Sequence, residues 1–127
     1  MILEIKLEGL EDVISRINKD IEPVLDNSIY TGATEYIQPP VSLYPPDFPG
    51  NTYQRTFNLQ QGWNTHHTGT LQTTVSNQVD YGPYVQGDEQ WALHASHGWQ
   101  KYDVVAEGQF PALADYVFER IKALYGV

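Results

Sequence analysis

An α+β fold is predicted for this 127-residue chain, with a small antiparallel sheet of three to four strands packed against a long N-terminal helix and a C-terminal helix. Three observations predict it: an alternating segment at the N-terminus, two long segments with helical periodicity, and two β-rich segments joined by Thr-Gly-Thr. A chain of this length can bury one core, so residues 1–127 are predicted to form a single domain.

The first strand and the first helix follow from the spacing of apolar residues. Residues 2–7 alternate between two faces, which is typical of a half-buried strand. After Gly9 the apolar residues recur at intervals of three and four, which predicts an amphipathic helix with Leu10, Val13, Ile14, Ile17, Ile21 and Leu25 on one face. Pro23 is expected to kink this helix, which is predicted to continue to about Tyr36.

A proline-rich segment follows the helix. Five prolines fall between Pro39 and Gly50, and this density favours extended or polyproline geometry. Residues 39–52 are therefore predicted to be an extended loop or arm. The arm has two interpretations, since its apolar residues can contact a neighbouring subunit or fold back over the chain's own core. These residues are Val41, Leu43, Tyr44 and Phe48.

The middle of the chain predicts short elements. Tyr53–Trp63 is predicted to hold one or two helical turns, with Phe57 and Leu59 pointing inward and Gly62 ending them. Thr68-Gly-Thr70 separates two β-rich segments and predicts the turn of a hairpin. With only three or four strands, one face and the edges of the sheet are expected to be left for another surface to cover.

The last part of the chain predicts a loop and a helix. Residues 80–100 combine glycine, proline and aromatic residues without a sustained period, so they are predicted to be mostly loop with one turn near 83–86. Pro111 suits the first position of a helix that ends at Gly126. The apolar stripe of this helix consists of Leu113, Val117, Ile121 and Leu124.

The charge excludes some classes of partner. Seven basic and sixteen acidic residues give a net charge of −9, which repels phosphate backbones and anionic lipid. Arg55 is the only basic residue between Lys19 and Lys101, so no basic stripe exists to follow a nucleic acid. Sequence-specific nucleic-acid binding and membrane insertion are not expected, and synthesis in the cytoplasm is expected.

Catalytic and metal-binding patterns are weak. The chain has no cysteine, so thiolate sites are excluded, and it has no HExxH, P-loop, nucleophile-elbow or dinucleotide pattern. His94 and His97 have a spacing that can bind zinc on a helix, which would favour a small metal-dependent hydrolase. Histidines in a solvated loop are the simpler interpretation, so neither an enzyme nor a cofactor is expected.

Aromatic residues make up 13% of the chain. A platform of tryptophan and tyrosine can stack on sugar rings or anchor a protein interface. This favours a carbohydrate- or peptide-binding module as the alternative function. The simpler interpretation places Trp63 and Trp99 in the core and Trp91 partly so.

Four segments, in their order, resemble the head–tail joining or tail-component proteins of tailed bacteriophages, a group that includes the tail-completion proteins. The opening strand with Glu8–Val13 is similar to the family's start, a strand followed by a G-L-x-x-L helix, and Arg55–Leu59 is similar to its R-T-G-x-L segment. Asp80–Gly87 resembles its Y-A-x-Y-V-E-x-G segment, and Gln109–Leu113 resembles the proline-containing entry to its last helix. Phe57 replaces the family's usual glycine.

This resemblance implies a non-enzymatic virion protein of the neck or tail end. It implies a homo-oligomeric ring, for example a hexamer, between the connector and the tail tube, with other phage neck or tail proteins as neighbours. The protein would be made in the host cytoplasm and located in the virion. The residues expected at the interface with a subunit or partner are Val41, Leu43, Tyr44, Phe48, Arg55, Tyr81, Tyr84 and Trp91.

Overall fold

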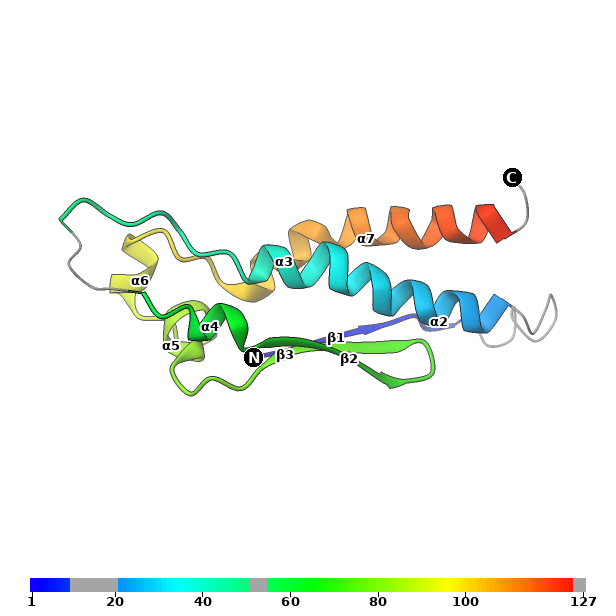
Figure 1. The fold of residues 1–127 in the computed structure, drawn as a ribbon, viewed down its shortest axis with the longest axis horizontal. Coiled ribbons are helices and arrows are strands. Elements are labelled where there is room, and N and C mark those ends of the chain that lie inside the picture. The colour runs from blue at the N-terminus through cyan, green and yellow to red at the C-terminus, as the bar shows by residue number, and fades with distance from the viewer. Residues whose placement is uncertain (10–20, 51–54, 125–127) are drawn as a thin grey trace.

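A three-stranded antiparallel sheet forms one layer of the computed structural model, which describes residues 1–9, 21–50 and 55–124 (Figure 1). The strand order is β1-β3-β2, and the strands are β1 (Ile2–Lys6), β2 (Trp63–Gly69) and β3 (Gln72–Asn77). β3 pairs with both neighbours, so the N-terminal strand and the hairpin form one sheet. The predicted α+β class and small antiparallel sheet are confirmed.

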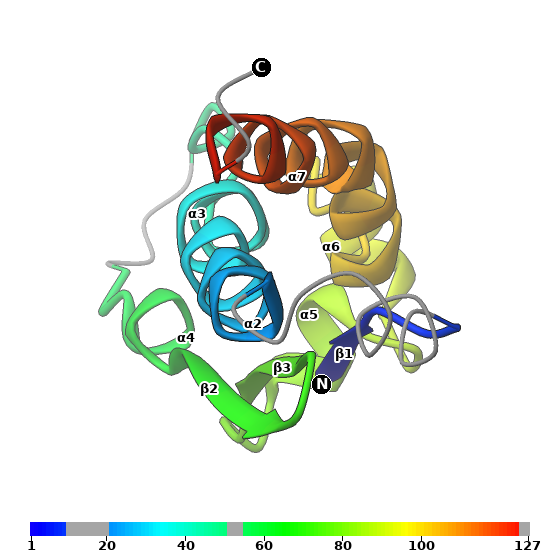
Figure 2. The ribbon, with the colours of Figure 1, turned by 90° about the vertical axis from the view of Figure 1, so that its right-hand side faces the viewer.

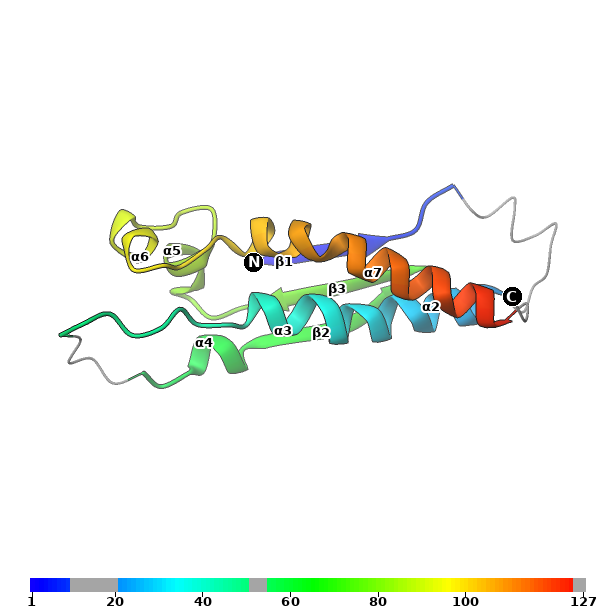
Figure 3. The ribbon, with the colours of Figure 1, turned by 90° about the horizontal axis from the view of Figure 1, so that it is seen from above.

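Two long helical segments cover one face of this sheet. The first consists of α2 (Ile21–Gly32), the π-helical turn η1 (Ala33–Ile37) and α3 (Gln38–Val41), and it lies directly on the sheet (Figure 2). The second, α7 (Tyr102–Leu124), packs along the first (Figure 2). Three short helices lie at one end of the elongated molecule: α4 (Asn58–Gln61), α5 (Gly82–Gln86) and α6 (Ala92–Ser96) (Figures 1 and 3).

The main core lies between the sheet and the helices. Alternate residues of β3 are buried, as expected for a strand with one covered face, and Val75 packs with Leu25 and Ile29 of α2 in one cluster. Gly32 allows α2 to approach α7 closely, since a Cβ atom there would lie 2.4 Å from Leu113 Cδ1. A larger residue at Gly32 would therefore force the Leu113 side chain to shift.

The other face of the sheet does not need the cover that was predicted. Its side chains are mainly polar: Glu4 and Lys6 of β1, Asn64 and His66 of β2 and Thr74 of β3 lie on this face. Ile2 of β1 is the large apolar side chain on this face of the strands, and 63% of its surface is exposed. A polar face of this kind is stable in water.

The first helical segment ends later than predicted. It continues past Tyr36 to Val41, although Pro39 and Pro40 have no backbone N–H. The π-helical turn accommodates them, because the Gln38 N–H bonds to the Ala33 carbonyl five residues earlier and the prolines then occupy the first positions of α3. The prediction of an extended arm is therefore wrong for residues 39–41, which are helical, and the described part of the arm lacks regular structure from Ser42 to Gly50. The predicted helix over residues 10–20 lies outside the described residues and stays a prediction.

The C-terminal helix is confirmed, but its predicted start at Pro111 is wrong. α7 begins nine residues earlier, at Tyr102, and Pro111 lies inside it. An internal proline removes one helical hydrogen bond. Burial of Tyr102 and Ala106 before the proline, and of Leu113 after it, holds both parts of the helix against the core.

The hairpin is confirmed with a shifted turn. The strands end at Gly69 and resume at Gln72, so the turn residues are Thr70 and Leu71 rather than Thr68–Thr70. Leu71 has a φ of +55° and is buried, and its N–H donates to Asp26 Oδ1 of α2 at 2.9 Å. Asp26 Oδ2 lies 2.6 Å from His67 Nε2. A carboxylate of the helix thus stabilises this strained turn.

Candidate functional site: an aromatic pocket

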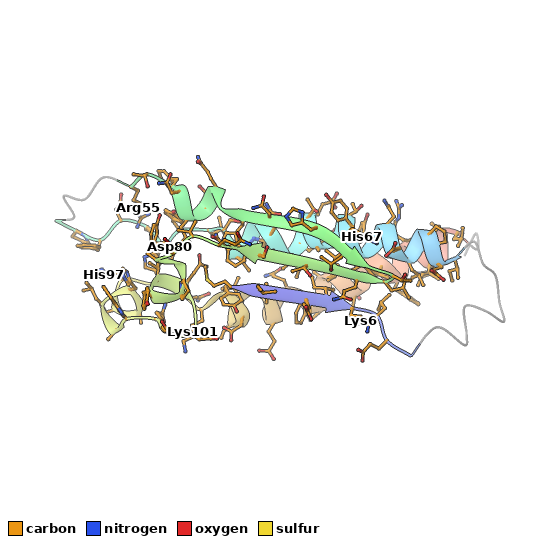
Figure 4. The ribbon with its side chains drawn as sticks, turned by 90° about the horizontal axis from the view of Figure 1, so that it is seen from below. Lys6, Arg55, His67, Asp80, His97 and Lys101 are labelled. Carbon is orange, nitrogen blue, oxygen red and sulfur yellow. The ribbon has the colours of Figure 1, made fainter. Side chains whose placement is uncertain are left out.

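The end of the molecule that carries α4, α5 and α6 contains a pocket of about 480 Å³ lined mainly by aromatic rings. The arm forms one wall, and α4 with the segment before it forms a second; α5, α6 and the residues next to these two helices form the remainder. Figure 4 shows Arg55, Asp80 and His97 together at this end, away from Lys6 and His67. The lining rings are Tyr44, Phe48, Phe57, Tyr81, Tyr84, Trp91 and Trp99.

Amide side chains, of which Gln86 and Asn77 are buried and Gln90 is partly buried, hold the pocket together and connect it to the rest of the fold. Gln86 of α5 donates to the Val41 carbonyl at 3.0 Å, and Asn77 at the end of β3 donates to the Leu59 carbonyl of α4 at 2.7 Å. Gln90 donates to the carbonyls of Val85 and Trp99, at 2.8 and 2.9 Å. Because buried polar groups are costly without partners, these bonds fix the short helices in place.

The arm folds back onto its own chain. The Tyr44 ring stacks on Phe57 with centroids 5.1 Å apart and meets the edge of Trp99 at 4.8 Å. Phe48 stacks on His97 at 3.9 Å. Burial raises the pKa of the Tyr44 hydroxyl, which accepts a hydrogen bond from the Gln60 N–H at 3.2 Å. Of the two interpretations of the arm, the structure of the single chain shows the intramolecular one.

Arg55 connects the arm to the segment before α4. Its Nη1 donates to the Pro45 carbonyl at 2.6 Å, and its Nε lies 3.0 Å from Asp47 Oδ1. Its guanidinium carbon is 5.4 Å from the centre of the Tyr44 ring. Arg55 is therefore engaged within its own chain, and its charge is balanced by Asp47.

Phe57 has an unusual backbone conformation. Its φ is +61°, in the left-handed region, and its side chain is 42% exposed. The prediction that Phe57 points inward is wrong, whereas Leu59 is buried as predicted. A non-glycine residue in this region is strained, and here the conformation brings the ring against Tyr44 at the pocket.

The outer part of the pocket is the most exposed. Trp91 is 58% exposed and Leu93 59%. The centre of the Trp91 ring lies 5.6 Å from that of Tyr84 and 5.8 Å from that of His94. Burial, and then the neighbouring His97, lower the pKa of His94, which favours a neutral imidazole at neutral pH.

The chemistry of this lining is suited to binding apolar groups. Among the residues that the structure describes, no three histidine, aspartate or glutamate side chains converge to hold a metal ion. The lining has one charged side chain, Arg55, which is engaged with Asp47. Its other polar groups are the Thr56 hydroxyl, the imidazoles of His94 and His97, and the hydroxyl or N–H groups at the edges of the tyrosine and tryptophan rings. The described lining residues include no aspartate, glutamate, asparagine or glutamine side chain that could bind two neighbouring sugar hydroxyls at once.

Six of the eight residues predicted for an interface line this pocket: Tyr44, Phe48, Arg55, Tyr81, Tyr84 and Trp91. Val41 instead is buried, at 1% exposure, and Leu43 is exposed outside the lining. Sequence reasoning missed Phe57, Leu93 and Trp99. For Leu93 and Trp99 the available signal was the cluster of large residues in 91–99. This segment was predicted to be loop, but in the structure it contains α6.

Comparison with known proteins finds no relative. No protein family, curated protein or solved structure matches this chain. Over the residues that the structure describes, no helix has both the length and the apolar character needed to cross a membrane. The function must therefore be argued from the chain's own residues.

Proposed function

We propose that this chain is a non-enzymatic virion protein of the phage neck or tail end, a tail-completion or head–tail joining protein that assembles as a ring through its aromatic pocket. One observation carries the proposal. Two of the segments that resemble the phage family, Arg55–Leu59 and Asp80–Gly87, are separated along the sequence but both contribute side chains to this one exposed pocket.

The exposure of the rings supports a docking role. Five of them are between 38% and 58% exposed: Phe48, Phe57, Tyr81, Tyr84 and Trp91. With about 150–250 Å² for each aromatic side chain, these exposed fractions add up to roughly 400 Å² of side-chain surface in and around the pocket. Patches of this size on a monomer are often functional, and with a polar rim this patch could form the centre of an interface of about 800 Å² per partner.

A protein partner fits the pocket better than a sugar. Carbohydrate binding would use the Trp91 face together with carboxylate or amide side chains for the hydroxyl groups, and the described lining residues include none of these. A protein surface needs only apolar side chains that fill the pocket and a polar rim. Carbohydrate binding is therefore the alternative function, and the experiment must distinguish it from ring assembly.

The test is the mass of the full chain by light scattering after size exclusion, across concentration, with negative-stain images of any large species. We expect a closed ring, and we expect Tyr84→Ala to weaken its formation. Tyr30→Ala is the matched control, because Tyr30 of α2 has the same 39% exposure but lies outside the pocket. A chain that is monomeric at every concentration and binds an immobilised glycan array would contradict the proposal.

A further inference from the structure

We propose that the outer part of the aromatic pocket, formed by the rings of Tyr81, Tyr84 and Trp91, binds a proline-rich segment of another protein. This inference rests on the proposed function, in which the pocket is a docking surface, and it names the chemistry of the partner. Two observations carry it. The side chains of the lining match carbonyl groups better than N–H groups, and the chain already holds a proline-rich segment of its own at this pocket.

The polar side chains of the lining are better suited to donate hydrogen bonds than to accept them. Guanidinium and indole N–H groups only donate, and Arg55, Trp91 and Trp99 supply them in this lining. The hydroxyl and imidazole groups of the lining can donate as well as accept. The described lining residues include no carboxylate or amide side chain to act as a strong acceptor. A ligand with many acceptors and few donors therefore matches this pocket.

A proline-rich segment has this balance of hydrogen-bonding groups. Proline has a carbonyl group but no backbone N–H, so each proline brings an acceptor without a donor. Every other residue brings one N–H that needs a partner when it is buried against the rings. A sugar likewise brings hydroxyl groups that donate as well as accept. The proline-rich segment therefore leaves fewer buried donors unpaired than an ordinary peptide or a sugar does.

The chain's own arm shows this type of contact. Residues 44–49 read Tyr-Pro-Pro-Asp-Phe-Pro, so three of the six have no backbone N–H. The Pro45 carbonyl accepts a hydrogen bond from Arg55 Nη1 at 2.6 Å. Gly98 leaves space for Pro45, since a Cβ atom at Gly98 would lie 3.2 Å from Pro45 Cβ. A donor side chain and close packing thus hold a proline-rich segment at the inner side of the pocket.

The outer rings stay open beyond the arm. Tyr81, Tyr84 and Trp91 are 45%, 39% and 58% exposed. The centres of the Tyr84 and Trp91 rings lie 5.6 Å apart, and their planes are inclined at 46°. Proline-rich segments dock in aromatic-lined grooves of other proteins. Because Arg55 holds the chain's own arm in place, the segment that covers the outer rings belongs to a different protein.

A stiff segment also suits the small area of these rings. The exposed aromatic surface in and around the pocket is roughly 400 Å², which is about half of what one partner buries in a stable protein interface. A proline-rich segment is already extended before it binds, so it loses little conformational entropy. We expect reversible binding with a dissociation constant between about 10 μM and 1 mM.

The experiment titrates the dilute full-length chain with a blocked decaproline peptide and follows the tryptophan indole N–H resonances by NMR. We expect a saturable shift at Trp91 and no change at Trp63, which is 2% exposed in the core. A blocked decamer of alternating glycine and serine has an N–H at every residue. It should bind about tenfold more weakly or worse, because these N–H groups lose water without gaining a partner.

Two variants with equal exposure separate the pocket from the rest of the surface. Trp91→Ala removes a ring of the pocket, and Phe118→Ala removes a ring of α7 outside it. Both side chains are 58% exposed, so folding should be retained, which circular dichroism checks. We expect Trp91→Ala to weaken decaproline binding about tenfold, measured at the indole resonance of Trp99, and Phe118→Ala to leave it unchanged.

The outcomes for this inference and for the proposed function can be told apart. If decaproline shifts no resonance at Trp91 while the chain forms rings, the inference is overturned and the proposed function stands. If decaproline binds but the chain is monomeric at every concentration, the inference stands and ring assembly fails. Equal affinity for the two peptides, or equal weakening by Trp91→Ala and Phe118→Ala, would overturn the inference.

Discussion

The two halves of this molecule use the same residue types in opposite ways. Between the sheet and the long helices, large apolar side chains such as Leu25 and Ile29 are at most 2% exposed. At the pocket end, Trp91 and Leu93 are more than half exposed. Burial accounts for the first set because it drives folding. The second set contributes little to folding, and we infer that it is kept for contact with a partner.

The largest expected effect comes from making the same substitution in the two halves. Leu25→Ala should lower the free energy of unfolding by roughly 2–5 kcal/mol, because it removes buried methyl groups and leaves a cavity. Leu93→Ala should change it by less than about 0.5 kcal/mol, since the side chain is largely in water. Urea denaturation of both variants measures the difference. Similar losses would show that the pocket end is part of the folding core.

A smaller effect is expected at the junction of the two halves. Asn77→Ala should lower the free energy of unfolding by about 2–3 kcal/mol, because the Leu59 carbonyl and the Val79 N–H both lose their partner. Asn64→Ala, on the exposed face of β2, should stay within about 0.5 kcal/mol. Denaturant curves followed by tryptophan fluorescence test this pair. Equal effects would mean that Asn77 does not hold α4 in place.

The smallest expected effect is on proton binding at His94. Its pKa is below the usual 6.5 because of burial and the nearby His97. The folded state therefore binds fewer protons there than the unfolded state, and this contribution to stability is present above pH 6.5 and is lost as the pH falls through the lowered pKa. Trp91→Ala should raise the pKa toward 6.5 by exposing the ring, as an NMR titration of the His94 resonance would show. An unchanged value would mean that Trp91 does not shield His94.

The parts of the fold that periodicity describes were predictable. The alternation of residues between two faces in 2–7 predicted β1, and the helical spacing of apolar residues predicted the C-terminal part of α7. Two errors in the predicted helix bounds occur at prolines. At Pro39–Pro40, where a loop was predicted, a π-helical turn lets the helix continue. At Pro111, where a helix start was predicted, burial of residues on both sides keeps the proline inside a longer helix.

The pocket was only partly predictable. Tyr44, Arg55, Tyr84 and Trp91 were identified by residue type and by resemblance, but their convergence depends on buried bonds such as Gln86 to Val41. These join segments far apart in sequence, and no spacing rule reveals them. Phe57 was misplaced because its inward direction assumed a helical backbone, whereas its φ is positive.

Hydroxyl-radical footprinting of the full chain, dilute and assembled, tests the central claim most directly. Tyr84 and Tyr30 have the same 39% exposure in the single chain, so they should be oxidised at similar rates when the protein is dilute. We predict that assembly protects Tyr84 and Trp91 several-fold and leaves Tyr30 unchanged. Equal rates at Tyr84 before and after assembly, or protection of Tyr30 instead, would contradict the assignment of the aromatic pocket as the docking surface.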